Sequence, residues 1–302
     1  MTDNNSPAFP FAFSAAQARR RRCGSRIALY LFLSGAAVLF SIPLLIMVLT
    51  SFKSMPEIRQ GTIFSLPAAL DLSAWVKAWS GACTGLACGG LSVGFWNSVR
   101  ILVPSVVLSI LAGALNGYAL ALWRFRGAHA VLTALMLGAF IPYQVILYPL
   151  VKIFSFLHLY STLPGIIVIH VVFGLPLMTM LFRNFYAAIP AELVKAARVD
   201  GAGFFRIFFE IMLPMSTNIL IVALILQTTG IWNDYLLGLI FAGHDNQPMT
   251  VQLNNIVTNG TGIVEYNVNM AATVLTALPP LAVYFLSGRY FVRGIASGAV
   301  KG

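Results

Sequence analysis

Six long apolar runs restrict the folds open to this chain of 302 residues. Each run is about 20 residues or longer, the length that an α-helix needs to cross the hydrocarbon core of a membrane. Only 9% of the residues are charged, whereas a soluble domain carries about 25%. Helices are the expected form because a membrane offers no water to backbone N–H and C=O groups, and the runs lack the alternation of barrel strands. We therefore predict an all-α membrane protein with six transmembrane helices at Ile27–Thr50, Trp96–Leu122, Ala130–Ile153, Leu163–Phe182, Ser216–Ile240 and Ala271–Phe291.

Basic residues are distributed unevenly between the segments that connect these runs. Most of them, including the run Arg19–Arg22, fall on one side. The other side holds Lys53, Arg59, Lys77 and Lys152. Because cytoplasmic segments carry the excess of Lys and Arg, we expect both termini in the cytoplasm. The net charge of +10 follows from this asymmetry, which argues against a nucleic-acid-binding surface.

The first 26 residues form a basic segment before the first span. A run such as Arg19–Arg22 followed by apolar residues also begins a signal peptide. Here the apolar stretch is about 24 residues, longer than a signal-peptide core, and no clear cleavage site ends it. We expect residues 1–26 to be a cytoplasmic tail on an uncleaved span, and residues 27–302 to form one transmembrane domain.

The first outer segment, about residues 51–95, contains two features of interest. The stretch Leu72–Trp79 has the composition of a short interfacial helix with tryptophans at headgroup level. Cys83 and Cys88 follow in Gly-rich sequence. They are able to pair in an oxidising periplasm, and two unpaired small residues are an equally favoured alternative. Neither arrangement supplies the ligands of a metal site.

Glycines and prolines mark positions of close packing or bending within the spans. Gly113 and Gly117 match the G-x-x-x-G motif, which indicates close approach of two helices. Prolines interrupt or begin spans at Pro142, Pro149, Pro164 and Pro176. They are consistent with kinked helices around a pathway and equally with ordinary membrane packing.

Segment 187–214, between the fourth and fifth spans, is polar and basic and more elaborate than a simple turn. Pro190 suits the first position of a helix, where no N–H is needed, and Glu192 in the first turn is favoured by the helix dipole. Gly201 is suited to end this helix in a left-handed turn. A second amphipathic segment, Phe204–Met212, follows. We predict two short helices joined at Gly201.

The first of these helices is predicted to present a small face, because Leu193, Ala196 and Ala197 recur at helical spacing. Alanines there permit close approach of a partner. The second helix is predicted to lie with its apolar side toward the bundle and to end at Pro214. Judged by physics alone, a pair of surface helices without a partner is the competing interpretation.

The loop also carries a recognisable motif. It reads Glu192-Leu-Val-Lys195-Ala196-Ala197-Arg-Val-Asp200-Gly201, followed by Ile211-Met-Leu213-Pro214. This spacing resembles the EAA loop of the membrane subunits of ABC importers, which transmits ATP-driven motion into the membrane. Over about residues 25–302 the chain resembles inner-membrane permease subunits of carbohydrate ABC importers of the maltose-type class, to which Trp232–Tyr235 and Tyr290–Gly302 are also similar. Within that class, the stretch Cys83–Gly90 resembles glucose or mannose importers.

The resemblance implies a bacterial inner-membrane location and a set of partners: an ATP-binding cassette ATPase dimer, a second permease subunit and a periplasmic sugar-binding protein. The chain is not expected to be an enzyme, because a P-loop requires Gly-Lys and the sequence contains no such dipeptide. No cofactor is expected. The residues that the resemblance assigns to ATPase coupling are Glu192, Lys195, Ala196, Ala197, Asp200, Gly201, Ile211, Leu213 and Pro214. The family pattern has Glu at the position of Lys195, so the ionic contact would pass to Glu192 or to an acid on the ATPase.

A sugar pathway needs polar groups that match hydroxyls, together with aromatic faces. The fifth span supplies both, and we predict that the pathway is lined by Gln227, Trp232, Asn233, Asp234 and Tyr235. The subgroup resemblance implies a monosaccharide such as glucose or mannose. An ion-coupled secondary transporter is the alternative; such coupling usually needs acids deep in the bundle, and only Asp234 comes close.

Overall fold

The computed structural model is helical in the part of the chain it describes, which is residues 15–84, 87–123, 125–258 and 264–299. Predictions for residues 1–14, 85–86, Arg124, 259–263 and 300–302 lie outside it. The helices long and apolar enough to cross a membrane are α1 (Ala15–Ser51), α4 (Ser92–Leu122), α7 (Leu163–Ala187) and α14 (Tyr266–Ala299). Two bent pairs supply the rest: α5 (Ala128–Phe140) with α6 (Tyr143–Phe156), and residues 204–215 with α11 (Thr217–Trp232). The all-α membrane fold is confirmed, and six spans are obtained when each bent pair counts as one.

Two of the predicted spans differ in shape from a continuous helix. The third span breaks between α5 and α6, whose axes are bent by 106°. Pro142 has no N–H and disfavours the helical conformation of the residue before it, and Ile141 is accordingly extended with a ψ of 119°. The fifth span was predicted to reach Ile240, but α11 ends at Trp232 and a separate short helix, α12 (Leu236–Phe241), follows. The predicted end of the fifth span is therefore wrong, whereas the third span breaks at Pro142, one of the prolines expected to interrupt or begin a span.

Helices α4 and α7 pack closely because glycines remove side-chain bulk between them. A Cβ placed on Gly113 would lie 2.3 Å from the Cβ of Met178, and one on Gly117 would lie 2.6 Å from the backbone nitrogen of Arg183. Such distances leave no room for any side chain. The prediction of close packing from the G-x-x-x-G motif is confirmed, and α4 and α7 form the centre of the bundle.

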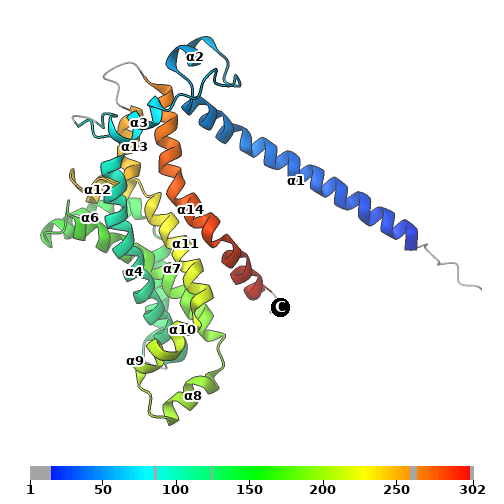
Figure 1. Ribbon diagram of the computed structural model, residues 1–302. Helices are drawn as coiled ribbons and strands as arrows, with labels where there is room; N and C mark the ends of the chain where they lie inside the picture. The colour runs from blue at the N-terminus through cyan, green and yellow to red at the C-terminus, as the bar shows by residue number, and fades with distance from the viewer. Residues whose placement is uncertain (1–14, 85–86, 124, 259–263, 300–302) are drawn as a thin grey trace, which may run out of the picture.

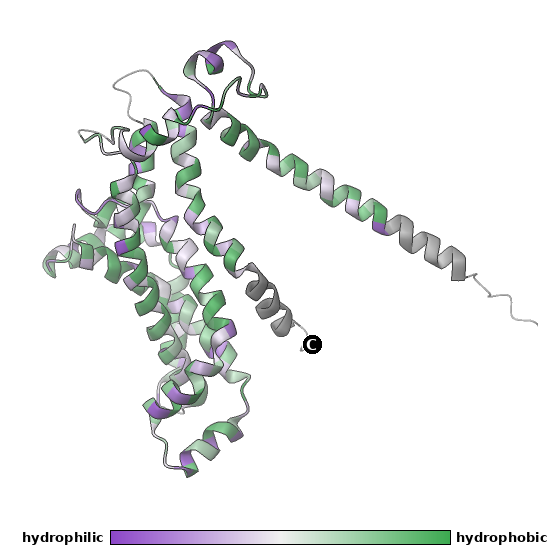
Figure 2. Ribbon diagram, in the orientation of Figure 1, coloured by the Kyte–Doolittle hydropathy of each residue, from purple (hydrophilic) through white to green (hydrophobic). Residues whose placement is uncertain are grey.

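Helix α1 lies apart from the rest of this chain. Figure 1 shows it diverging from the bundle, with its C-terminal end near α2 and the start of α14. None of the most apolar stretch of its span is buried, and Figure 2 shows that most of its coloured residues are hydrophobic. The basic run Arg19–Arg22 continues the same helix, because α1 begins at Ala15. The surface of this span is therefore covered by lipid or by another subunit.

The two ends of the bundle carry different short elements (Figure 1). One end holds α2 (Met55–Gln60), α3 (Ser73–Ser80) and α13 (Met249–Thr258). Helix α3 confirms the predicted short helix around Trp75 and Trp79. Cys83 and Cys88 at this end form a disulfide, which decides between the two alternatives left by the sequence. The opposite end holds the segment between α7 and α11.

Candidate functional site

The segment between α7 and α11 contains the predicted pair of helices. The first is α8 (Ala191–Val199); the second runs through α9 (Phe204–Ile207), one turn of π-helix, η1 (Phe208–Met212), and α10 (Leu213–Met215). We call residues 188–215 the coupling loop. Pro190 precedes α8 with a ψ of 130°, so it flanks the helix rather than opening it as predicted. Pro214 lies within α10, and the chain breaks two residues later, at Ser216.

The end of α8 depends on the backbone conformation of Gly201. Its φ is 78°, in the left-handed region. The Gly201 N–H donates to the Arg198 carbonyl at 3.0 Å, and the Ala202 N–H donates to the Ala197 carbonyl at 2.9 Å. These are the two hydrogen bonds of a Schellman motif. The predicted left-handed helix end is confirmed, and it sets the direction in which the second helix leaves α8.

An aromatic cluster fixes the second helix of the coupling loop to α4. It consists of Tyr118 from α4 and Trp123, which directly follows that helix, with Phe204 and Phe208 from the loop. The ring of Tyr118, which is fully buried, lies 4.8 Å from that of Phe204 and 5.5 Å from that of Phe208. Trp123 lies 4.9 Å from Phe204, and the Tyr118 hydroxyl donates to the Phe204 carbonyl at 3.3 Å. These ring geometries and the hydrogen bond join the loop to the end of a span.

Helix α8 is held to the same span by a second kind of contact. Val194 and Ala197 are buried in the core that also contains Tyr118. The guanidinium of Arg198 lies 4.1 Å from the ring centroid of Trp123, within the range of a cation–π interaction. Both helices of the loop therefore contact the C-terminal end of this span, the second through Tyr118 and Trp123 and α8 through Trp123.

The junction with α11 is bent, and it is tied to α7. The axes of the segment 204–215 and α11 differ by 80°. Ser216 is fully buried at the bend; its hydroxyl donates to the Met212 carbonyl at 2.5 Å and lies 2.9 Å from the hydroxyl of Tyr186 on α7. The loop thus does not continue α11 as a straight rod. It contacts α4, α7 and α11 together.

The outer surface of α8 is exposed and has a mixed character. Glu192 and Lys195 are exposed, and so is Val199, at 87%. The predicted face of Leu193, Ala196 and Ala197 is wrong in one respect, since Ala197 is buried while the other two residues are exposed. Of the other residues predicted to couple to an ATPase, Ile211 and Leu213 are partly buried, whereas Asp200, Gly201 and Pro214 are exposed. An apolar patch flanked by charges is what a protein partner would cover.

The predicted pathway residues do not share one surface. Gln227 and Trp232 are buried at 6% and 3%, whereas Asn233 and Tyr235 are exposed. The indole N–H of Trp232 donates to the Thr276 carbonyl of α14 at 3.0 Å. That carbonyl lies four residues before Pro280, which has no N–H to offer it. Trp232 therefore supplies the hydrogen bond that a proline removed from α14.

Asp234 lies in the break after α11, not inside the span as predicted. Its carboxylate accepts the N–H of Gly238 at 2.9 Å, and its carbonyl accepts the hydroxyl of Thr250 at 2.7 Å. Burial raises the pKa of Asp234, while the hydrogen bonds from Gly238 and Leu237 act in the opposite direction. This geometry makes Asp234 a cap for α12.

Sequence reasoning missed the residues that anchor the loop, namely Tyr118, Trp123, Tyr186, Arg198 and Ser216. Aromatic residues near the ends of spans are expected at any membrane interface. Their positions in the sequence therefore did not indicate that they contact the coupling loop. Within the described residues, no three or more His, Cys, Asp or Glu side chains gather as they would around a metal ion.

Comparisons with known proteins agree with this geometry. Residues 105–297 match the model of a family described as "Binding-protein-dependent transport system inner membrane component". The "Probable ABC transporter permease protein PH1216" of Pyrococcus horikoshii is 43% identical over 59% of this chain, and the match spans 65% of that relative's length. The "Arabinooligosaccharides transport system permease protein AraQ" of Halalkalibacterium halodurans is 32% identical over 86% of this chain and 91% of its own. A crystal structure of a bacterial ABC transporter that imports the acidic polysaccharide alginate contains a chain that shares the fold, with a TM-score of 0.77, 21% identity, and coverage of 94% of this chain and 100% of that one.

Proposed function

This chain belongs to the family of binding-protein-dependent transport system inner membrane components, and we propose that it forms half of the pathway of an ATP-driven sugar importer. The observation that carries the proposal is the coupling loop, whose exposed helix α8 is fixed to the spans through the aromatic cluster. The sequence lacks the Gly-Lys of a P-loop, so the ATPase is a separate polypeptide. An ATPase dimer that closes on α8 moves this helix and, with it, the attached ends of α4 and α7.

The coupling loop lies in the cytoplasm, and both termini lie on its side of the membrane. Two observations at opposite ends support this orientation. Arg183, Lys195 and Arg206 lie at or near the coupling loop, in agreement with the cytoplasmic excess of basic residues. The disulfide between Cys83 and Cys88 lies at the other end, and disulfides persist in an oxidising periplasm.

The remaining partners are a second permease subunit and a periplasmic sugar-binding protein; the description of the family, which names binding-protein-dependent transport, supports the second of them. The substrate is a sugar, because the named relative AraQ is a permease for arabinooligosaccharides. Neither that name nor the alginate transporter supports the narrower prediction of glucose or mannose. Asn233 and Tyr235, which are exposed past the end of α11, are the pathway residues that remain in position to meet a substrate.

Reconstitution in proteoliposomes tests the proposal. Vesicles that hold this chain, the second permease and the ATPase should accumulate radiolabelled sugar when ATP and the binding protein are supplied, and uptake should stop when the ATPase is omitted. Uptake by the purified chain alone, driven by a proton or sodium gradient, would instead establish the ion-coupled alternative, which the family assignment does not favour.

A further inference from the structure

A cleft of about 230 Å³, lined by both polar and apolar residues, lies at the end of the molecule opposite the coupling loop. One wall is formed by Thr84, Ala87, Gly89, Gly90 and Val93, which lie just before α4 or in its first turn. The other wall is the segment 244–252, between α12 and the first turn of α13. The two walls are more than 150 residues apart in the sequence, and nothing in the coupling loop explains why they meet here.

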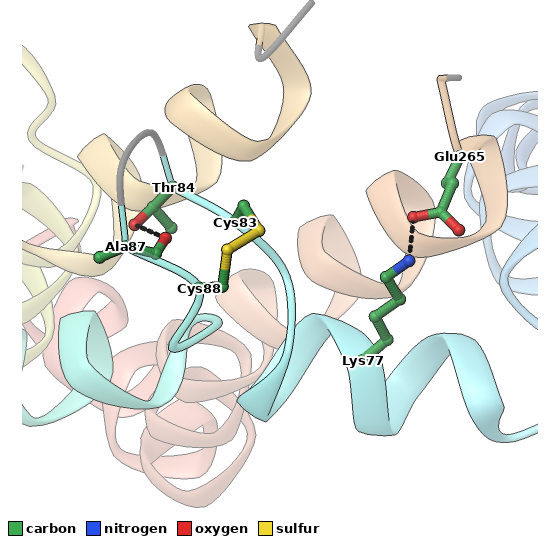
Figure 3. The surroundings of a disulfide bond; sticks show 6 residues. All are labelled: Lys77, Cys83, Thr84, Ala87, Cys88 and Glu265. Atoms are coloured by element: carbon green, nitrogen blue, oxygen red, sulfur yellow. Dashed lines mark hydrogen bonds and ion pairs between the residues drawn. A yellow bond between two sulfur atoms is a disulfide. The ribbon is translucent and has the colours of Figure 1, made fainter. Parts of the chain in front are cut away.

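The first wall is a short hairpin closed by covalent and hydrogen bonds. Figure 3 shows the disulfide between Cys83 and Cys88, with Thr84 and Ala87 facing each other across the hairpin. The N–H of Thr84 donates to the Ala87 carbonyl at 2.8 Å, and the N–H of Gly90 donates to the Ala82 carbonyl at 2.9 Å. The cross-link leaves the residues that it joins with fewer conformations to lose when a partner binds.

The second wall is fixed to α4 by side-chain hydrogen bonds. The amide of Asn97 donates to the carbonyls of Asp245 and Gln247 at 2.9 and 3.2 Å. The N–H of Gly94 donates to the Gln252 side chain at 2.8 Å, and the N–H of Met249 donates to the hydroxyl of Ser98 at the same distance. Both walls are therefore held on the first two turns of one helix, and the cleft is preformed.

The chemistry of the cleft favours a cation. The side chain of Asp245 is 95% exposed, and its partner within ion-pair distance among the described residues is the ring of His244 at 3.4 Å. The stretch 241–270 contains no Lys or Arg. Among the described residues that line the cleft there is no Phe, Tyr or Trp on which a sugar ring could stack, and the cleft is smaller than the range of about 300–1,000 Å³ of small-molecule sites. It suits one long basic side chain.

We propose that this cleft receives a Lys or Arg side chain presented by the periplasmic sugar-binding protein. The disulfide hairpin is then a docking element, and Asp245 supplies the complementary charge. The inference rests on the proposed function, because it takes the partner from that assembly. It adds the place of contact and the charge of the contacting group.

The test uses the complete reconstituted importer and the binding protein encoded with it. The ATPase rate is measured against binding-protein concentration for the native complex, for Asp245→Asn and for Cys83→Ser with Cys88→Ser. Each change should raise the half-saturating concentration about fivefold or more, the effect of about 1 kcal/mol of lost interaction, while stimulation at saturating binding protein is retained. The Asp245→Asn complex should also lose part of the salt dependence of binding.

Lys77→Met is the matched control. Lys77 lies in the same outer segment and pairs with Glu265 at 2.5 Å (Figure 3), but it does not line the cleft. The Lys77→Met change should leave the half-saturating concentration of the binding protein unchanged. Half-saturating concentrations within twofold of the native value for both Asp245→Asn and the double serine variant would overturn the proposal. A native complex that the binding protein does not stimulate at all would instead count against the proposed function.

Discussion

The two ends of this molecule both combine aromatic packing with hydrogen bonds, and they differ in which of the two joins the most distant segments. At the coupling end, rings from α4 and the coupling loop pack together, and one guanidinium covers a tryptophan. At the outer end, directional polar bonds join segments far apart in the sequence. Asn97 reaches Asp245 across 148 residues, and Asn267 reaches the Lys53 carbonyl across 214. Aromatic packing tolerates small shifts in geometry, whereas hydrogen bonds specify distance and angle.

This difference has a mechanical consequence. In the proposed mechanism the coupling loop moves together with the ATPase and displaces the spans. A broad apolar contact suits this role because it is retained while the loop moves. An outer surface that must present a fixed shape to a partner benefits from directional bonds and a disulfide. The following variants test that division, in order of decreasing effect.

Replacing Gly201 by Val should have the largest effect on the coupling end. A β-branched residue at a φ of 78° is strained by about 1–2 kcal/mol, so α8 would end differently and lose its direction. We expect sugar uptake in reconstituted vesicles to fall about tenfold or more, with membrane insertion retained. Gly203→Ala is the control, because the φ there is −80° and a Cβ would meet nothing within 4 Å. Normal uptake by the Val variant would refute the role of the turn.

Replacing Trp123 by Leu should separate ATP hydrolysis from transport. The change removes the ring that contacts Phe204 and Arg198, so α8 could move without moving α4. The number of ATP molecules hydrolysed per sugar transported should rise about fivefold, which corresponds to about 1 kcal/mol of lost coupling. A merely structural role would lower both rates in proportion. Arg206→Met is the matched control, since Arg206 pairs with Glu210 on the exposed side of the loop.

The sequence predicted the features that depend on local rules. Hydropathy located the spans, and the left-handed turn at Gly201 followed from glycine at the end of an amphipathic segment. The close approach at Gly113 and Gly117 followed from their spacing. These features need only neighbours within a few turns, which a single sequence displays.

Features that depend on distant segments could not be predicted. The 106° bend after Phe140 requires the position of the neighbouring helices as well as the proline. The inward position of Ala197 is decided by the rotation of α8 against the bundle. Likewise, Trp232 was assigned to the pathway because its ring suits a sugar, and only the fold shows that its N–H is used by the Thr276 carbonyl.

A double-mutant cycle tests the hydrogen bond from the Trp232 indole to the Thr276 carbonyl. Trp232→Phe keeps a ring but leaves the Thr276 carbonyl unpaired, and should lower the free energy of unfolding by about 1 kcal/mol. Pro280→Ala restores an N–H four residues after Thr276, so the same Trp232 change made in that background should cost much less. Unfolding of the detergent-solubilised chain, followed by tryptophan fluorescence and circular dichroism, measures both. Equal costs in the two backgrounds would show that the carbonyl is not the acceptor that matters.

Replacing Lys195 by Glu should have the smallest effect. The side chain is exposed on α8 and no hydrogen bond or ion pair to it is found in the described part of the chain. Exposed ion pairs contribute about 0–1 kcal/mol, so we expect uptake and ATPase affinity to change by no more than about threefold. Glu192, one turn earlier, is exposed on the same helix and remains available to a basic partner. If the Glu variant instead fails to assemble with the ATPase while Lys195→Met assembles normally, the ATPase must carry an acid opposite this position. That outcome would show that the coupling end, like the outer end, depends on a specific polar contact.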